Sequence, residues 1–274
     1  MGYKKISNEQ EFQLVQEYIN GVPVNVLMKR YGFKTKKSIT DKLKKYYPNN
    51  YEKLIEKARE NRKGYNYKLK EIKNEFDAYF LGLMMTDGYI VGNKIGIDLV
   101  DEDCIDFLSK SIGKEYNIYP QENHQTKFRL LLTDKELVDN LKRFGIVERK
   151  SYTLSAPILN KEEEKFIPYI LRGIIDGDGS VSPTSYGGTQ FFIVTMSEDF
   201  KNWIVDILEN KLYMVDIHTS QNKNGLWRIE TSNQYNILKL IALVYNKPFG
   251  MMRKYNKLRK TFRDYNSDAL LEIR

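Results

Sequence analysis

Apolar residues near the start of the chain recur every three or four positions, the spacing that places them on one face of an α-helix. This pattern predicts a helix over residues 8–20, which begins with a capping box formed by Ser7 and Gln10. A second, shorter helix is expected over residues 24–31 and a third over residues 35–46. The chain is therefore expected to begin with a small helical domain.

From residue 76 onwards the pattern repeats with an offset of 91 residues, which aligns Asp87 with Asp178. After the apolar segment that carries each aspartate, the pattern predicts a strand, a helix, a hairpin and a second helix. In the first copy these elements are expected at residues 93–100, 101–113, 118–133 and 134–145. In the second copy they are expected at residues 189–196, 198–212, 214–231 and 234–245.

The repeat predicts an α+β fold, in which a pseudo-twofold axis relates two α-β-β-α-β-β-α halves. The expected divisions are a helical module at residues 1–48, a charged linker at 49–75, half 1 at 76–160, half 2 at 161–265 and a C-terminal tail at 266–274. The linker is expected to be partly helical near its start.

Basic residues are concentrated in the helical module and the linker. The whole chain has a net charge of +8. Residues 1–75 hold 18 Lys and Arg and 9 Asp and Glu, a net charge of +9, whereas the other 199 residues hold 26 and 27, a net charge of −1. A localised basic module predicts a polyanionic partner, and nucleic acid is favoured over a membrane.

The sequence excludes several classes of protein. A single cysteine, Cys104, forms neither a disulfide within the chain nor a zinc cluster of the CxxC kind. His124 and His218 are too far apart for an HxxxH metalloprotease helix. No apolar run reaches 18 residues and the N-terminus lacks a secretory signal, so the protein is expected to be intracellular, in the cytoplasm.

The two apolar segments of the repeat carry a recognisable motif. They read FLGLMMTDG at residues 80–88 and LRGIIDGDG at residues 171–179. Both resemble the LAGLIDADG motif of homing endonucleases, and two such motifs at matching places in a repeat are more specific than one. The resemblance covers about residues 76–260. It implies a DNA-binding saddle in which one chain supplies both halves, so that a monomer suffices.

Glycines are expected to shape the two motif helices. Gly82 and Gly173 are expected at the helix interface, where the backbones touch and only a small residue fits. Gly88 and Gly179 are expected to end the two helices, because glycine tolerates a positive φ.

The resemblance implies that Asp87 and Asp178 are the catalytic pair. Two carboxylates brought together by helices about a pseudo-dyad repel each other unless a divalent cation lies between them. The expected cofactor is Mg²⁺, or Mn²⁺, and Gly88 and Gly179 are placed with the two acids in the metal site. A calcium loop is an alternative for the second motif alone.

The resemblance also implies a basic residue near the active site in each half. The closest matches are Lys150 and Lys254, each after the last helix of its half, and the alternatives for them are a phosphate clamp or a surface lysine. The halves have diverged, because Met85 stands where the second motif has Asp176.

Polar side chains on the predicted hairpins are candidates for reading DNA bases. Amides suit adenine, and arginine or lysine suits guanine in the major groove. The candidates in half 1 are Lys94, Gln121, Asn123, Gln125, Lys127 and Arg129, and those in half 2 are Gln190, Asn222, Asn224 and Arg228. The alternative is an ordinary solvent-facing sheet surface.

The helical module has the order of a helix-turn-helix domain, with a basic third helix. Lys36, Lys37 and Lys42 are its candidate DNA contacts, and a plain three-helix cap is the alternative.

The predicted function is metal-dependent hydrolysis of double-stranded DNA at a long site, with no protein partner required. One alternative keeps the fold without cleavage, as a transcription regulator or an intron maturase. Another is a helix-turn-helix regulator with a C-terminal ligand or dimerisation module. An RNA-binding protein is disfavoured because RRM-type aromatic motifs are absent from the sequence.

Overall fold

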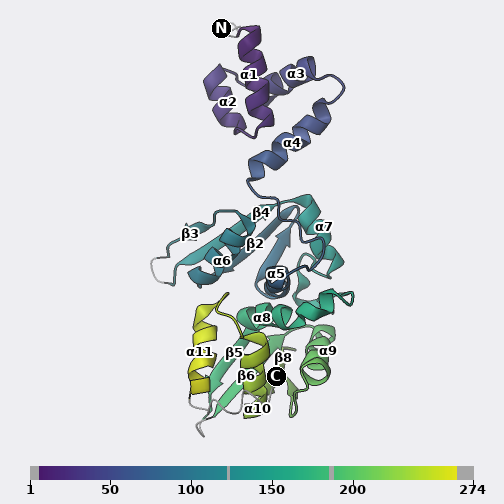
Figure 1. Cartoon of the computed structure of the whole chain (residues 1–274), viewed down its shortest axis with the longest axis vertical. Coiled ribbons are helices and arrows are strands. Elements are labelled where there is room, and N and C mark those ends of the chain that lie inside the picture. Colours follow the sequence, from purple (N-terminus) through teal and green to yellow (C-terminus); the bar gives the residue numbers. More distant parts are fainter. Residues whose placement is uncertain (1–5, 122–123, 185–187, 264–274) are drawn as a thin grey trace. The chain divides into compact units, whose positions relative to one another are not determined.

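The computed structural model describes residues 6–121, 124–184 and 188–263 (Figure 1). The chain forms two compact units, Met1–Asn66 and Tyr67–Arg274. The predicted tail and Asn123 lie outside the described residues. Across the described ranges, no helix combines the length and the apolar character needed to cross a bilayer.

The N-terminal unit is helical, as predicted. Its helices are α1 (Asn8–Ile19), α2 (Val24–Tyr31), α3 (Lys36–Tyr46) and α4 (Tyr51–Lys63). The capping box is confirmed, since the Gln10 amide N–H donates to Ser7 Oγ over 3.2 Å and the Ser7 N–H donates to Gln10 Oε1 over 3.0 Å. Gly32 ends α2 with a φ of 73°, and a short turn leads into α3.

The predicted linker over residues 49–75 is helical near its start, as expected, but its parts belong to the two compact units. Its first part is α4, which packs against α1 and α3 and buries Ala58 completely. Its last part belongs to the second unit, where Leu69 and Ile72 are buried and Lys68 Nζ binds the Asp134 carboxylate over 2.6 Å. The stretch is highly charged, so the few apolar residues that pack into the first unit (Ala58) and the second unit (Leu69 and Ile72) were not recognised in the sequence.

The second unit contains the two predicted halves in the predicted order of elements. Half 1 comprises α5 (Glu75–Met85), β1 (Gly88–Val91), β2 (Lys94–Leu99), α6 (Glu102–Ile112), β3 (Asn117–Tyr119), β4 (Lys127–Thr133) and α7 (Lys135–Arg143). Half 2 comprises α8 (Ile167–Asp178), β5 (Gly179–Pro183), β6 (Thr189–Thr195), α9 (Glu198–Asp206), β7 (His218–Gln221), β8 (Trp227–Thr231) and α10 (Gln234–Lys239). Only half 2 adds π-helical turns, η3 (Ile207–Lys211) and η4 (Leu240–Val244), among the described residues, and α11 (Met252–Arg263) follows.

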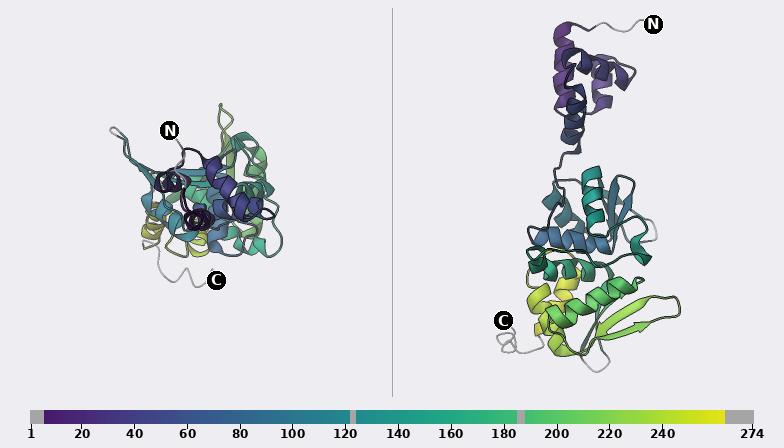
Figure 2. Two further views of the ribbon diagram at one scale, coloured as in Figure 1. Left: turned by 90° about the horizontal axis from the view of Figure 1, so that it is seen from above. Right: turned by 90° about the vertical axis from the view of Figure 1, so that its right-hand side faces the viewer.

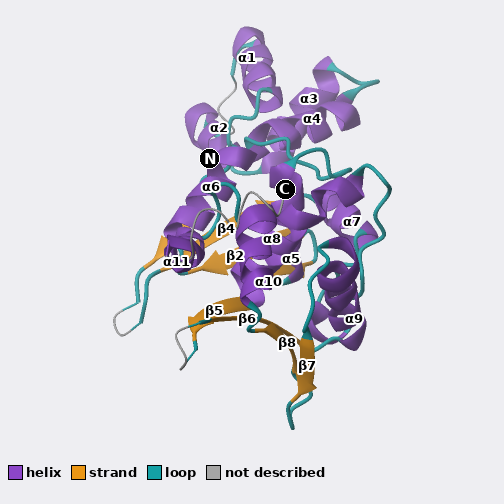
Figure 3. Ribbon diagram, turned by 60° about the horizontal axis from the view of Figure 1, so that its bottom comes forward, coloured by secondary structure: helices purple, strands orange, loops and turns teal. Residues whose placement is uncertain are grey.

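Each half builds one antiparallel four-stranded sheet with the same topology, β1-β2-β4-β3 in half 1 and β5-β6-β8-β7 in half 2. The predicted α+β class is therefore confirmed. Alternate strand residues such as Ile97 and Leu130 are buried against helices, and Figure 3 shows α8 and α10 on one side of the second sheet. The view from above in Figure 2 shows the β3–β4 and β7–β8 hairpins projecting from the same side of this unit.

Candidate active site

The two motif helices, α5 and α8, touch through their backbones. A Cβ built on Gly82 would lie 2.0 Å from the carbonyl oxygen of Ile170, and one built on Gly173 would lie 2.3 Å from that of Tyr79. Such distances exclude any side chain, so the predicted role of both glycines at the interface is confirmed. The contact fixes the ends of the two helices relative to each other.

This interface brings the two candidate acids together. Asp178 is the last residue of α8, and Asp87 lies in the turn between α5 and β1. A Cβ built on Gly177 would lie 3.1 Å from Asp87 Oδ2, so the Asp87 carboxylate adjoins the residue that precedes Asp178. The predicted pairing of the two acids thus agrees with the geometry of the chain.

The protein environment opposes ionisation of both carboxyl groups. Loss of water raises the pKa of Asp178 to about 6, and the negative charge of Asp87 contributes to this rise. Loss of water also raises the pKa of Asp87, while Lys254 and Lys150 act in the opposite direction. A cation beside the two groups would favour their ionised forms and lower both pKa values.

A buried lysine binds the end of each motif helix. Lys150 Nζ donates to the carbonyl oxygens of Gly88 and of Thr86, the latter over 2.9 Å. Lys254 Nζ contacts four carbonyl oxygens in half 2, those of Ile175 at 2.8 Å, Asp176 at 2.5 Å, Gly179 at 2.7 Å and, more weakly, Gly177 at 3.4 Å. Each ammonium group compensates the negative end of a helix dipole. The structure thus places Lys150 and Lys254 beside the motif helices, and their catalytic role stays a prediction.

Burial lowers the pKa of both lysines. Asp178 and Asp87 act in the opposite direction on the pKa of Lys150. Asp176 and Asp87 do so for the pKa of Lys254, where Arg253 favours the neutral form. The acids and the lysines therefore form one electrostatic cluster, although Lys150 and Lys254 donate to carbonyl groups rather than to the two carboxylates.

Gly179 ends α8 as predicted, whereas α5 already ends at its C-cap Thr86, two residues before Gly88. The carbonyl oxygens of both glycines accept hydrogen bonds from the two lysines, and their place among the metal ligands stays a prediction. Gly179 is extended, with a φ of −93°, and neither glycine has a positive φ. Glycine is needed because the chain folds back on its own helix, where an added Cβ would lie 2.7 Å from the Cα of Met84 or of Ile175.

The donor set fits a hard divalent cation of the Mg²⁺ type. No group of three or more His, Cys, Asp or Glu residues that could hold a metal occurs in the part of the chain that the structure describes. Mg²⁺ commonly binds through one or two carboxylates and completes its shell with water and substrate phosphates. Asp87 and Asp178 supply the two carboxylates.

An open cavity of about 390 Å³ lies at the end of α8. Its lining is formed by Gly177, Gly179, Ser180, Val181, Arg253, Lys254 and Lys257. Arg253 also forms an ion pair with Asp101 over 2.7 Å. The cationic lining next to the acids suits an anionic group.

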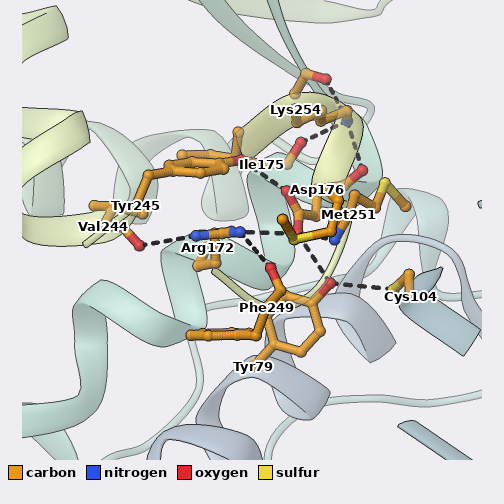
Figure 4. Close-up of polar contacts among 12 residues, drawn as sticks. Tyr79, Cys104, Arg172, Ile175, Asp176, Val244, Tyr245, Phe249, Met251 and Lys254 are labelled. Atoms are coloured by element: carbon orange, nitrogen blue, oxygen red, sulfur yellow. Dashed lines mark hydrogen bonds and ion pairs between the residues drawn. The ribbon is translucent and has the colours of Figure 1, made fainter. Parts of the chain in front are cut away.

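A buried polar network around Asp176 was missed by sequence reasoning (Figure 4). The Asp176 carboxylate accepts hydrogen bonds from Tyr79 Oη at 2.9 Å, Tyr245 Oη at 2.7 Å and the Met251 N–H at 3.0 Å. It also pairs with Arg172, whose Nε lies 3.3 Å away. The available signal was a charged pair four residues apart in an otherwise apolar helix. The network joins both motif helices to the turn that precedes Lys254.

The predicted base-reading residues lie in two different settings. On the strands, Lys94 and Lys127 are exposed, and Arg129, Gln190 and Arg228 are half-buried. In contrast, Gln121 and Gln125 lie in the loop between β3 and β4, and Asn222 and Asn224 lie in the turn between β7 and β8. The Asn222 side chain accepts from the N–H groups of Asn224 and Leu226, so its oxygen shapes the turn.

The lysines predicted on α3 also separate into two groups. Lys36 and Lys37 are exposed at the start of the helix. Lys42 is bound by the Glu11 carboxylate, which also pairs with Lys45 over 2.7 Å. Lys42 as a DNA contact stays a prediction, and its pairing with Glu11 was not visible from helical spacing within α3, because Glu11 comes from α1.

Comparisons with known proteins give matches in structure only. No family model and no curated protein matches the sequence. The full-length DUF199/WhiA protein from Thermatoga maritima is 12% identical with a TM-score of 0.46, over 73% of this chain and 64% of that protein, so this chain spans less than two thirds of it. The meganuclease I-SmaMI bound to uncleaveable DNA is 12% identical with a TM-score of 0.46, over 73% and 95% of the two chains. The LAGLIDADG homing endonuclease I-GzeII in complex with its DNA target is 9% identical with a TM-score of 0.47, over 73% and 95%.

Proposed function

We propose that this protein is a divalent-metal-dependent endonuclease that hydrolyses both strands of duplex DNA at a long, specific site. The observation that carries the proposal is the pairing of Asp87 and Asp178 at the ends of two helices in backbone contact. One carboxylate comes from each half of the repeat, as a reaction on two DNA strands requires. Because one chain supplies both acids, the expected active species is a monomer.

Asp87 and Asp178 are the residues that would hold Mg²⁺, or Mn²⁺. The bound cation would activate water and stabilise the charge of the leaving oxygen. Because the pKa of Asp178 is raised to about 6, protons compete with the cation for this carboxylate near and below that pH.

Lys150 and Lys254 are proposed to act mainly as fixed positive charges. Three carbonyl oxygens lie within 2.8 Å of Lys254 Nζ, so its donors are occupied and it is poorly placed to release a proton to substrate. A positive charge held near the acids stabilises negative charge that develops on a phosphate. The same bonds hold the turn that carries each aspartate.

DNA contacts are proposed at three places. The sheet surfaces supply base-reading side chains, and the cavity with Arg253 and Lys257 would take a backbone phosphate. The exposed Lys36 and Lys37 at the start of α3 suit a helix-turn-helix contact with a second stretch of duplex.

A second candidate is a DNA-binding regulator or intron maturase that does not cut. The α2–α3 arrangement with exposed lysines favours it, because DNA binding by this unit needs no catalytic acids. Cleavage itself distinguishes the two candidates.

The deciding experiment incubates the full chain with a random-insert DNA library, with and without Mg²⁺. Wild type is compared with Asp87→Asn, Asp178→Asn and the control Asp199→Asn, an exposed acid on α9. We expect wild type and the control to cut one long site only with metal, and both active-site variants to bind that site without double-strand cleavage. Tight binding by wild type without cutting under any divalent metal would sink the nuclease proposal and favour the second candidate.

A further inference from the structure

An arginine on the partly open face of each sheet is held by a carboxylate. In half 1, Arg129 forms a fork with Asp98, with 2.8 Å from Nε to Oδ1 and 2.5 Å from Nη2 to Oδ2. Its guanidinium lies 4.8 Å from the ring centre of Tyr119. Tyr89 Oη donates to the same carboxylate over 3.3 Å. The guanidinium is therefore fixed from two sides.

Half 2 repeats this arrangement with different residues. Arg228 Nε lies 2.5 Å from Glu230 Oε2, and its guanidinium lies 3.6 Å from the ring centre of Phe192. Gln190 donates to the same Glu230 oxygen over 2.9 Å. An acid, an aromatic ring and one further polar group again surround one arginine.

Strand pairing shows that the two arginines occupy equivalent positions. In half 1, Gly88 pairs with Ile97, which pairs with Leu130. In half 2, Gly179 pairs with Ile193, which pairs with Ile229. Gly88 and Gly179 directly follow the two active-site acids, and the two arginines directly precede Leu130 and Ile229. Each arginine is thus two strands away from the acid of its own half.

The carboxylates that hold them are not equivalent. Asp98 lies on β2, across the sheet from Arg129, whereas Glu230 lies two residues after Arg228 on the same strand. An arginine at the equivalent place of each sheet is therefore held by a carboxylate from a different backbone position.

The partial exposure of these ion pairs favours a role in recognition over a role in stability. The side chain of Arg129 is 37% exposed and that of Arg228 is 35%, while Asp98 and Glu230 are 26% and 28% exposed. Such partly exposed ion pairs contribute little to stability. A guanidinium has five donors in one plane, and the carboxylate uses only part of them. The remaining donors suit the O6 and N7 acceptors of guanine.

We propose that Arg129 and Arg228 are a matched pair of guanine-reading residues, positioned by Asp98 and Glu230, which recognise target positions equally distant from the centre of the cleavage site. The inference rests on the proposed binding of DNA by the sheets. The arginines would touch the bases, and the two carboxylates are positioning residues that reduce the freedom lost when the arginine binds.

The test measures the base preference of the full chain at every target position, by selection from a DNA library. Arg129→Ala and Arg228→Ala should each lose roughly 10- to 100-fold discrimination for guanine at one position, and the two positions should be symmetric about the cut. Arg129→Lys should lose the same preference while it keeps the charge, because lysine lacks the two-donor fork.

Variants of the two positioning carboxylates should change the base preference, which a purely structural role would leave unchanged. Asp98→Asn and Glu230→Gln should relax the same two positions by a smaller factor, and should bind non-specific DNA more tightly because a negative charge is lost. The control pair is Asp106→Asn and Lys110→Ala, an exposed ion pair on α6, which packs against the buried face of the first sheet. The controls should leave the preference profile unchanged.

Failure of the guanine-reading inference and failure of the proposed function give different results in this test. If wild type shows no defined target, the proposed function fails. If wild type has a defined target and the arginine variants keep the wild-type profile, the guanine-reading inference is wrong and the nuclease proposal stands. If each arginine controls one position but the two positions are not symmetric, the pairing of Arg129 with Arg228 is wrong.

Discussion

The two motif helices differ in the kind of side-chain pair that they bury at equivalent positions. At two positions one turn apart, α5 carries Leu81 and Met85, whereas α8 carries Arg172 and Asp176 at the equivalent places. All four side chains are buried. One half therefore fills this space with an apolar pair and the other with an ion pair. A buried charge needs a partner of opposite sign, so Arg172 and Asp176 depend on each other.

The ion pair of half 2 also contacts residues outside its own helix. The Arg172 guanidinium lies 3.7 Å from the ring centre of Tyr245 and donates to the Phe249 carbonyl over 2.5 Å. Asp176 binds the turn before α11 through the Met251 N–H, and α11 carries Lys254. In half 1, Lys150 follows Arg149, which adopts a left-handed conformation with a φ of 57°. Half 2 thus orders its lysine through a buried network, and half 1 does so through a local turn.

The largest expected effect comes from breaking this network. Asp176→Ala should lower the free energy of unfolding by about 3–5 kcal/mol, because it leaves the Arg172 charge buried without its partner. The double variant Arg172→Leu/Asp176→Met copies the pair of half 1 and should lose less than the single variant. Denaturant unfolding of the full chain measures both. A double variant less stable than Asp176→Ala would show that the two halves are not interchangeable at this pair.

The next largest effect concerns the two lysines. Lys150→Met and Lys254→Met should each slow cleavage of one strand by roughly 10²- to 10³-fold, because each removes a fixed charge from one half of the site. The measurement is the rate of cutting of each end-labelled strand, with Lys161→Met, an exposed lysine, as the control. Equal slowing of both strands by either variant would contradict the assignment of one lysine to one half.

The smallest effect is on stability as a function of pH. The folded-state pKa of Asp178, about 6, lies above its ordinary value of 3.8, so the folded protein binds this proton more tightly than the unfolded chain does. The associated stability is present at low pH and is lost as pH rises through about 6. Without divalent metal, Asp178→Asn should therefore be more stable than wild type above about pH 6 and should lose this advantage towards about pH 4. Thermal unfolding of both proteins between about pH 4 and pH 8 measures this difference. A stability advantage of Asp178→Asn that grew towards low pH would contradict the prediction.

The repeat made much of the fold predictable from the sequence. Gly82 and Gly173 marked the helix contact, and the alignment of Asp87 with Asp178 placed the two acids together, because helical spacing and internal symmetry are both visible along one chain. The extended conformation of Gly88 and Gly179 was not predictable, since it depends on how closely the first strand of each half returns to its helix.

Contacts between elements account for most of what the sequence did not show. Arg129 was recognised from the sequence only as a polar hairpin residue, and strand register brings Asp98 directly opposite. Glu11 reaches Lys42 from another helix in the same way. Both partners are far away in sequence and become neighbours only through tertiary structure, which the periodicity of a single element does not encode.

The backbone contact between α5 and α8 also sets limits on protein engineering. A half taken from another chain would have to present glycine at the same level of its helix, since even one methyl group at Gly82 or Gly173 would enter the opposite main chain. Chimeras should therefore be joined so that both motif helices come from one parent and only the sheets are exchanged. If the protein is the proposed nuclease, each sheet could then be recombined for a new half-target while the spacing of the two cuts is preserved.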